Sequence, residues 1–369
     1  MHTYEEELNL IASDIDRQAS ILEGRNKALR DDAVGIARSL PTAPRRVYLI
    51  GCGDSLDAGI AARYVWEGLI DAPVEAVPAM TFAASVVDTA PEGALVVALS
   101  QSGKVSRVVE AVRAARTRGL ATATITANST SALAREPSDA TWVIDFEKVG
   151  AVPGTTSHLL GAMALYELGA ALSDDEAGCA SLHSDLDGLA ALVERTVGNA
   201  RSKAEEQAAT MARELPFLAL GYGPTLSSAR FTVRKLLELT QVVALSQETE
   251  EYAHDEYSLV DQRFRVMLFA PTGKGSARSL EIAGYLRRLG AHLSVVTSSA
   301  SAKDFRELAD IVYEVPVGPV SLAPLLFAVP GQLLSVAAGR KLGGSLYGMA
   351  ERVHREDGDP QIYESEIAL

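Results

Sequence analysis

One stretch combines residue types that can bind a charged ligand. An apolar run rich in valine ends in residues 100–103, Ser-Gln-Ser-Gly, and a helical pattern of valines follows from residue 105. These polar residues therefore lie in a turn between a buried strand and the start of a helix. Hydroxyls, a carboxamide and backbone N–H groups at the positive end of a helix suit an anion. An ordinary strand-to-helix turn with a capping serine explains the stretch equally well.

Residues suited to proton transfer occur in the second half of the chain. Lys235 and Glu238 lie three residues apart and so share one face of a predicted helix. A partly desolvated carboxylate on a rigid helix can move a proton between carbon atoms, because burial brings its pKa toward neutrality. His254 is of the residue type that most often donates or accepts a proton in enzymes. From spacing alone, a solvated Lys–Glu pair and a surface histidine in an acidic loop are the simpler interpretations.

Length and charge restrict the classes of function. The 369 residues suffice for two domains, and 34 basic against 48 acidic residues give a net charge of −14. This charge argues against nucleic acid or an anionic membrane as the main partner. Cys52 and Cys179 fit no metal site or disulfide framework, and we expect no metal and no cofactor. We see no signal peptide and no apolar run of about 18 residues, and expect a cytoplasmic protein.

Strand-like and helix-like segments alternate along the chain. Residues 4 to about 30 read as one or two amphipathic helices, and strands are expected at residues 47–50, 74–77, 94–99, 121–126 and 141–144. Helical segments between such strands predict a parallel sheet covered on both faces. The Gly-Cys-Gly turn at residues 51–53 does not fit a dinucleotide-binding motif, because the third glycine, Gly59, comes too late.

The second half of the chain repeats the plan of the first. Residues 217–225 mirror residues 47–55, and residues 266–276 mirror the stretch around the Ser-Gln-Ser-Gly turn. The pairs Gly103 and Gly273, and Lys104 and Lys274, are both separated by 170 positions. Such matches at one offset indicate an internal duplication. Ala-Pro-Thr replaces Ser-Gln-Ser in the second copy, so we expect the anion site in the first copy.

Together these motifs resemble the tandem sugar-isomerase-domain (SIS) family. The similarity is greatest to the isomerase half of glutamine–fructose-6-phosphate aminotransferase and to stand-alone sugar-phosphate isomerases and deaminases. The resemblance covers residues 45–342 and implies an α/β fold of two flavodoxin-like three-layer sandwiches. We expect N-terminal helices at 1–40, SIS domains at 41–175 and 214–345, a helical connection at 176–213 and a tail at 346–369.

The resemblance also implies roles for individual residues. It assigns substrate binding to two turns and a nearby loop, at Gly53, Asp54, Ser55, Ser100, Gln101, Ser102, Ser106, Thr155 and Thr156. Glu238 corresponds to the family's acid/base and His254 to its ring-opening histidine. Their separation, 254 − 238 = 16 positions, equals the family's spacing. Lys235 falls on a helix lysine that tunes the carboxylate or holds substrate.

Three places depart from the family pattern. Lys104 and Val105 replace a glutamate and a phosphate-binding threonine, and Asp54 replaces another threonine. Ser365 stands where the family has a lysine that forms an imine with the open ketose. The sequence therefore does not support imine catalysis through the tail. Because Asp54 places a carboxylate beside the anion site, the chemical identity of the substrate's anionic group is left open. Only residues 1–40 precede the first SIS domain, so we expect no glutamine-dependent amide transfer.

The leading prediction is an aldose–ketose isomerase that acts on an anionic, phosphorylated hexose or amino sugar through an enediol-type proton transfer. The alternatives are an amino-sugar phosphate deaminase or deglycase, an isomerase of a sulfonated sugar, and a non-catalytic sugar-phosphate sensor. The expected partners are a small anionic sugar and a second copy of the chain, in a homodimer with shared active sites. Nucleic acid and membranes are not expected as partners.

Overall fold

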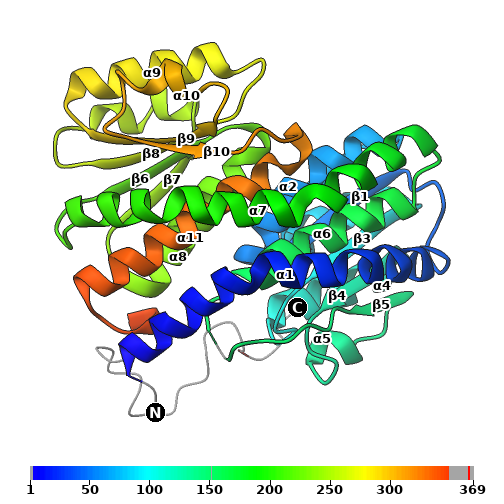
Figure 1. Ribbon diagram of the computed structural model, residues 1–369. Coiled ribbons are helices and arrows are strands. Elements are labelled where there is room, and N and C mark those ends of the chain that lie inside the picture. The colour runs from blue at the N-terminus through cyan, green and yellow to red at the C-terminus, as the bar shows by residue number, and fades with distance from the viewer. Residues whose placement is uncertain (1–2, 151, 349–364, 366–369) are drawn as a thin grey trace. The chain divides into compact units, whose positions relative to one another are not determined.

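The computed structural model describes residues 3–150, 152–348 and 365. Its chain divides into two compact units, each built around a five-stranded parallel sheet (Figure 1). The first unit comprises residues 20–147, 156–187 and 365, and the second comprises residues 3–19, 148–155 and 188–348. The long helices α1 (Tyr4–Ala37) and α7 (Glu176–Thr210) contribute residues to both.

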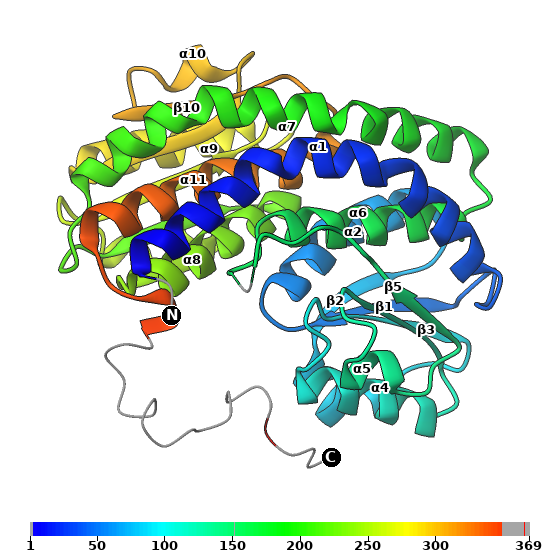
Figure 2. The ribbon, with the colours of Figure 1, turned by 60° about the horizontal axis from the view of Figure 1, so that its bottom comes forward.

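The sheet of the first unit has the order β2-β1-β3-β4-β5, with every neighbouring pair parallel. Its strands are β1 (Arg46–Gly51), β2 (Val74–Pro78), β3 (Ala94–Leu99), β4 (Ala121–Thr126) and β5 (Ala140–Val143). Figure 2 shows helices on both faces of this sheet. One face carries α2 (Asp54–Leu69) and α6 (Thr156–Ala171), and the other carries α4 (Ser106–Thr117) and α5 (Ala132–Arg135). The short turn α3 (Ala79–Thr81) leads into a π-helical segment, residues 82–86.

The second unit repeats this strand order, as β10-β9-β8-β6-β7. Its strands are β6 (Phe217–Gly221), β7 (Ala244–Glu248), β8 (Arg265–Ala270), β9 (His292–Ser298) and β10 (Ile311–Val315). Its helices are α8 (Leu226–Thr240), α9 (Ser276–Leu289), α10 (Ala302–Phe305) and α11 (Ala323–Leu342). Helices α9 and α10 cover one face of the sheet, and α8 and α11 cover the other. The predicted α/β class, with two parallel sheets flanked by helices, is confirmed.

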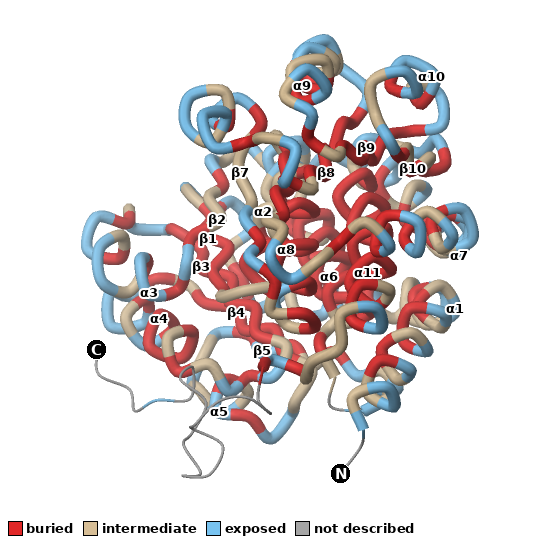
Figure 3. The backbone as a smooth tube through the Cα atoms, turned by 90° about the vertical axis from the view of Figure 1, so that its left-hand side faces the viewer, coloured by how far each residue is buried: buried red, intermediate tan, exposed pale blue. Residues whose placement is uncertain are grey.

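Burial explains why these segments form core strands and core helices. All six residues of β3 are buried, as expected for a β-branched run covered on both faces. Helix α6 is apolar around its whole circumference and nearly all of it is buried, whereas an ordinary surface helix keeps a polar face. Figure 3 shows the central strands β1, β3, β4, β8 and β9, together with α6 and α11, as mostly buried and the outer sides of α9 and α10 as exposed.

Helix α11 lies in an apolar segment longer than the sequence analysis expected. Residues Val320–Leu342 are long and apolar enough to cross a bilayer by length and composition, although no such segment was expected. However, 83% of the most apolar window is buried inside the protein. Because a central helix of a folded core needs the same composition, α11 is explained by its packing along α8.

Candidate functional site

The turns that carry the predicted anion-binding residues flank one position in the first sheet. Strands β1 and β3 are neighbours, with Ile50 opposite Ala98, while the chain continues from β1 to β2 on one side and from β3 to β4 on the other. This is the switch point of the strand order, where open parallel sheets bind ligands beyond the carboxyl ends of their strands. The sequence motifs at residues 51–55 and 100–103 follow these two strands directly.

The turn after β3 is fixed by its backbone and by its packing. The N–H of Ser100 donates to the carbonyl of Ile125, and the N–H of Gly103 donates to the carbonyl of Ser100, both at 3.0 Å. Gly103 has a φ of 64°, and a Cβ there would overlap the hydroxyl of Ser131. Ser131 in turn caps α5. Only glycine therefore fits this position, and the turn is held rigidly against the start of α5.

The polar side chains of this turn have different surroundings. Ser100 is buried, whereas Ser102 is exposed and its Oγ accepts a hydrogen bond from the N–H of Lys104 at 3.3 Å. Gln101 donates through Nε2 to the carbonyl of Ser157 at 2.6 Å. Its Oε1 is buried and has no partner among the described residues. Gln101 therefore ties the turn to the start of α6, and Ser102 is the side chain most open to a ligand.

Two helix N-termini point to the same position. Helix α4 begins at Ser106 after Val105, and α2 begins at Asp54 after Gly53. Neither Val105 nor Gly53 has a side chain that can accept a hydrogen bond, but their carbonyls accept from the N–H groups of Val108 and Leu56, both at 3.0 Å. The helix dipoles at these two N-termini favour a bound anion. The seryl side chain of Ser55, in the first turn of α2, is largely buried.

Asp54 changes the electrostatics of this position. Its carboxylate lies in the first turn of α2, where a negative charge is favourable and competes with a bound anion for the helix dipole. Its backbone carbonyl lies 3.2 Å from Nδ1 of the buried His158. The first unit thus offers an anion site whose positive potential is reduced by a resident carboxylate.

One residue of the tail lies at the start of α4. The hydroxyl of Ser106 donates to the backbone carbonyl of Ser365 at 2.5 Å, and Nη2 of Arg107 lies 3.4 Å from the Ser365 hydroxyl. Ser365 is the residue that the predicted resemblance places at the family's imine-forming lysine. The rest of the predicted tail from residue 349 lies outside the described residues.

Thr155 and Thr156 have no exposed hydroxyl in this structure. Thr155 is buried in the second unit and donates to Asp14 of α1. Thr156 is the first residue of α6 in the first unit and is fully buried. Substrate contact by these two residues remains a prediction, and it requires a local rearrangement of the segment.

In the second unit, a tyrosine occupies the corresponding switch point. Tyr222 stands at the position of Cys52 in the repeat, and its ring packs over Gly275 at the start of α9. Its hydroxyl lies 3.3 Å from the carbonyl of Pro271. Burial raises the pKa of the Tyr222 phenol. The sequence analysis missed this feature, although an aromatic residue in a glycine-rich turn at the repeat offset was a signal for it.

Glu238 and Lys235 form a close pair on α8. Lys235 Nζ lies 2.5 Å from Glu238 Oε2 and 5.1 Å from the centre of the Phe231 ring. The Lys235 side chain is only 2% exposed, whereas that of Glu238 is 23% exposed. A buried ammonium therefore holds a carboxylate that still reaches the surface. Helix α8 starts in a helical turn at Gly223–Thr225 directly after β6, so the sheet fixes its position.

His254 lies in an exposed loop of the second unit. Its side chain is 69% exposed, and Nε2 lies 3.9 Å from Oε1 of Glu250. Arg278 holds that carboxylate with two hydrogen bonds of 2.6 and 2.9 Å, which lower the pKa of Glu250. The described residues contain no group of three or more His, Cys, Asp or Glu side chains arranged to hold a metal ion.

Comparison with known proteins finds a domain model that matches the region of the first sheet. Residues 42–168 match the model of the SIS domain, which confirms the predicted resemblance. A glutamine–fructose-6-phosphate aminotransferase (isomerizing) of Caulobacter vibrioides is 27% identical over 295 residues, covering 79% of this chain and 48% of that protein. The chain therefore spans about half the length of the curated relatives it matches.

Solved structures of similar fold include the C-terminal domain of glucosamine-fructose-6-phosphate aminotransferase from Francisella tularensis. Its TM-score is 0.82 at 20% identity, covering 91% of this chain and 97% of that one. Tagatose-6-phosphate ketose/aldose isomerase from Escherichia coli has a TM-score of 0.72 at 20% identity, covering 94% and 95%. These similarities show the fold.

Proposed function

Because residues 42–168 form a SIS domain, we propose that this chain interconverts the aldose and ketose forms of an anionic hexose or amino sugar, most simply a sugar phosphate. Two similar proteins support this choice, since one is an isomerizing glutamine–fructose-6-phosphate aminotransferase and the other a ketose/aldose isomerase. The turns after β1 and β3 bind the anionic group. Glu238 moves the proton, and His254 opens the sugar ring.

The observation that carries the proposal is the pair of Lys235 and Glu238. A base for this reaction must be ionised, partly withdrawn from water and held in one orientation. The carboxylate of Glu238 meets these requirements, because the buried ammonium of Lys235 lies 2.5 Å away and α8 is packed along α11. An exposed Lys–Glu pair on a helix surface is not fixed in this way.

The chemistry balances with these groups. His254 donates a proton to the ring oxygen as the bond to C1 breaks, and the hydroxyl on C1 gives up its proton to solvent, which gives the open-chain aldose. Glu238 removes the proton from C2 and returns it to C1, while a proton passes from the oxygen on C2 to the oxygen on C1 through the enediol. The product is the ketose. Ser55, Ser100, Gln101 and Ser102 hold the anionic group during these steps.

The test is Glu238→Gln, assayed with a panel of hexose 6-phosphates and amino-hexose 6-phosphates in D₂O. We expect ketose formation and deuterium incorporation at the reacting carbon to fall about 10²–10⁴-fold, with substrate binding nearly unchanged. Ammonia release is measured in the same assays and would identify a deaminase instead.

The matched control is Glu206→Gln on α7. Glu206 also pairs with a lysine three residues earlier, at 2.8 Å from Lys203 Nζ, but both side chains are exposed. This variant should exchange deuterium at the wild-type rate. If Glu238→Gln also exchanges at that rate, Glu238 is not the base and the isomerase proposal fails.

Asp54 favours a second candidate, an isomerase of a sulfonated sugar. A sulfonate carries one negative charge, whereas a phosphate monoester carries about −1.5 to −2 at neutral pH. The carboxylate in the first turn of α2 reduces the positive potential available, and this penalises the phosphate more. If the substrate is a sulfonate, wild type should prefer the 6-sulfonate of the hexose and Asp54→Asn should shift preference toward the 6-phosphate.

A further inference from the structure

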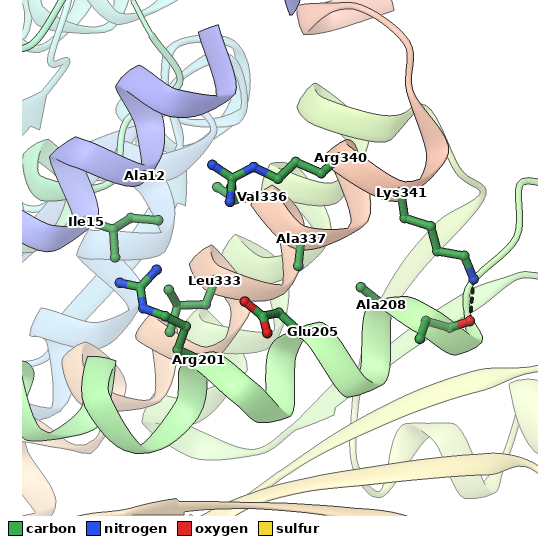
Figure 4. A pocket seen from close by; sticks show the side chains of 11 residues that line it. Ala12, Ile15, Arg201, Glu205, Ala208, Leu333, Val336, Ala337, Arg340 and Lys341 are labelled. Carbon is green, nitrogen blue, oxygen red and sulfur yellow. Dashed lines mark hydrogen bonds between the residues drawn. The ribbon is translucent and has the colours of Figure 1, made fainter. Parts of the chain in front are cut away.

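We propose that a pocket in the second unit, between α1, α7 and α11, binds a small zwitterion with an apolar body, such as an apolar amino acid. The cavity measures about 370 Å³, within the range of small-molecule sites. Figure 4 shows its walls, and all of its lining residues belong to the second unit. Neither the turns after β1 and β3 nor the Lys235–Glu238 pair of α8, which are assigned to the sugar, contribute a residue to this pocket.

The walls of this pocket select an apolar ligand body. Its uncharged lining residues are all aliphatic: Ala12, Ile15, Ala208, Ala209, Leu333, Val336 and Ala337. The four alanines leave the space open between the three helices. No hydroxyl or amide side chain lines the pocket among the described residues. A sugar would therefore lose the hydrogen bonds of its hydroxyls to water without replacing them, which argues against a second sugar site.

A solvent-exposed carboxylate on the lining of the pocket can bind a cationic group. Glu205 of α7 points toward the space between Arg201 and Ala337 in Figure 4. Its side chain has no hydrogen-bond or ion-pair partner among the described residues. A ligand ammonium is the complementary group for Glu205.

Two arginines supply donors for an anionic group. Arg201 pairs with Asp16, and Arg340 lies 3.3 Å from Glu5 Oε1 and 2.7 Å from Asn9 Oδ1. A guanidinium has five N–H donors, so these contacts leave donors on both side chains for a ligand carboxylate. Lys341 is different, because its ammonium caps the end of α7 through the carbonyls of Ala209 and Met211. The pocket therefore presents one anion and two incompletely used cations around an aliphatic interior.

The test compares L-leucine with two probes that each lack one charge. These are 4-methylpentanoate, without the ammonium, and 3-methylbutylamine, without the carboxylate. Isothermal titration calorimetry on the full chain should show saturable binding of leucine, with each probe bound at least about tenfold more weakly. Equal binding of leucine and 4-methylpentanoate would contradict a role for Glu205.

Two variants connect binding to the pocket. Glu205→Gln should weaken leucine binding about tenfold and remove the advantage of leucine over 4-methylpentanoate, whereas the neighbouring Glu206→Gln should change neither. Ala337→Trp should abolish binding by filling the cavity, and its folding is checked by circular dichroism. Absence of saturable binding to wild type up to about 10 mM, or binding unaffected by Glu205→Gln, overturns the proposal. Because binding and not turnover is measured, either outcome leaves the proposed isomerase untouched.

Discussion

The ring of Tyr222 fills the space that a side chain at position 275 would occupy. A Cβ on Gly275 would be 2.5 Å from the Tyr222 hydroxyl oxygen and would also overlap ring carbons. Gly275→Ala should therefore destabilise the protein by about 1–3 kcal/mol, because the ring is packed and cannot move aside freely. The measurement is the midpoint of urea unfolding.

Gly284→Ala in the same helix is the matched control. A Cβ at Gly284 meets only the flexible end of Arg288, at 3.7 Å, so this variant should be stabilised by about 0.5–1 kcal/mol. In the double variant Gly275→Ala with Tyr222→Ala, removal of the ring should relieve part of the clash. Its loss of stability should therefore be smaller than the sum of the losses in the two single variants. Similar unfolding midpoints for Gly275→Ala and Gly284→Ala would mean that Tyr222 does not occupy this position.

Ser102→Ala should raise the Michaelis constant for the anionic sugar about ten- to hundredfold. Ser102 is the exposed hydroxyl of the turn after β3, and a hydrogen bond to a charged group contributes about 1.5–3 kcal/mol. Thr272→Val is the control at the repeat offset, since the second turn is closed by Tyr222 and should not bind the sugar. An unchanged constant for Ser102→Ala would place the anion elsewhere.

The core strands and the duplication of the fold were predictable from the sequence. The valine-rich run before Ser100 predicted a buried parallel strand, because only such a strand needs apolar residues on both faces. The 170-residue offset predicted two units of one plan, and both sheets have the same strand order. These features depend on local composition and on the periodicity of the chain.

Features that depend on packing between distant residues were not predictable. The ring of Tyr222 closes the second switch point only because Gly275, 53 positions later, has no side chain (275 − 222 = 53). The hydroxyl of Thr155 is engaged by Asp14, 141 positions away (155 − 14 = 141), so a residue expected at a substrate loop is buried. Helix α1 runs unbroken over Tyr4–Ala37, where the sequence allowed one or two shorter helices.

Glu167 should make stability depend on pH. It is 1% exposed in α6, with Arg30 Nε at 3.4 Å and His183 Nε2 at 3.0 Å. Burial raises the pKa of Glu167 from 4.5 to about 7, against the lowering effect of Arg30. Between these two values the folded state holds a proton that the unfolded state has released. The stability contributed by Glu167 should therefore fall as pH rises from 4.5 to 7, by up to about 3 kcal/mol, and then level off.

Glu167→Gln isolates this contribution. Burial lowers the pKa of His183, so below pH 6.5 its effect is opposite in sign and stability falls as pH decreases. Wild type and Glu167→Gln both contain His183, so the contribution of this histidine largely cancels in the difference between their stabilities. We expect the variant to gain about 2–3 kcal/mol relative to wild type between pH 5 and pH 8, from urea unfolding at each pH. A difference that does not change with pH would show that Glu167 is ionised throughout.

The chain should form a homodimer through the surface around α8 and the edge strand β7. Exposed apolar residues occur there at Leu237, Val243 and Leu245, and in the following loop at Tyr257 and Leu259. Large exposed apolar patches mark protein–protein interaction sites. Val243→Glu should reduce the mass in solution from twice that of the chain to that of one chain. Val317→Glu, equally exposed but elsewhere in the second unit, should remain dimeric.

The last prediction concerns which subunit supplies His254. In this structure its side chain is exposed, and Nε2 lies 3.9 Å from Oε1 of Glu250. If the histidine acts in the neighbouring subunit, Glu238→Gln and His254→Ala inactivate different sites. Unfolding and refolding the two variants together at equal concentration should then give half heterodimers, each with one intact site of two, and about a quarter of wild-type activity. If each site uses its own chain's histidine, every site in the mixture carries a defect and no activity returns. Recovery that disappears when Val243→Glu is added to both chains would tie the shared site to the dimer surface at β7.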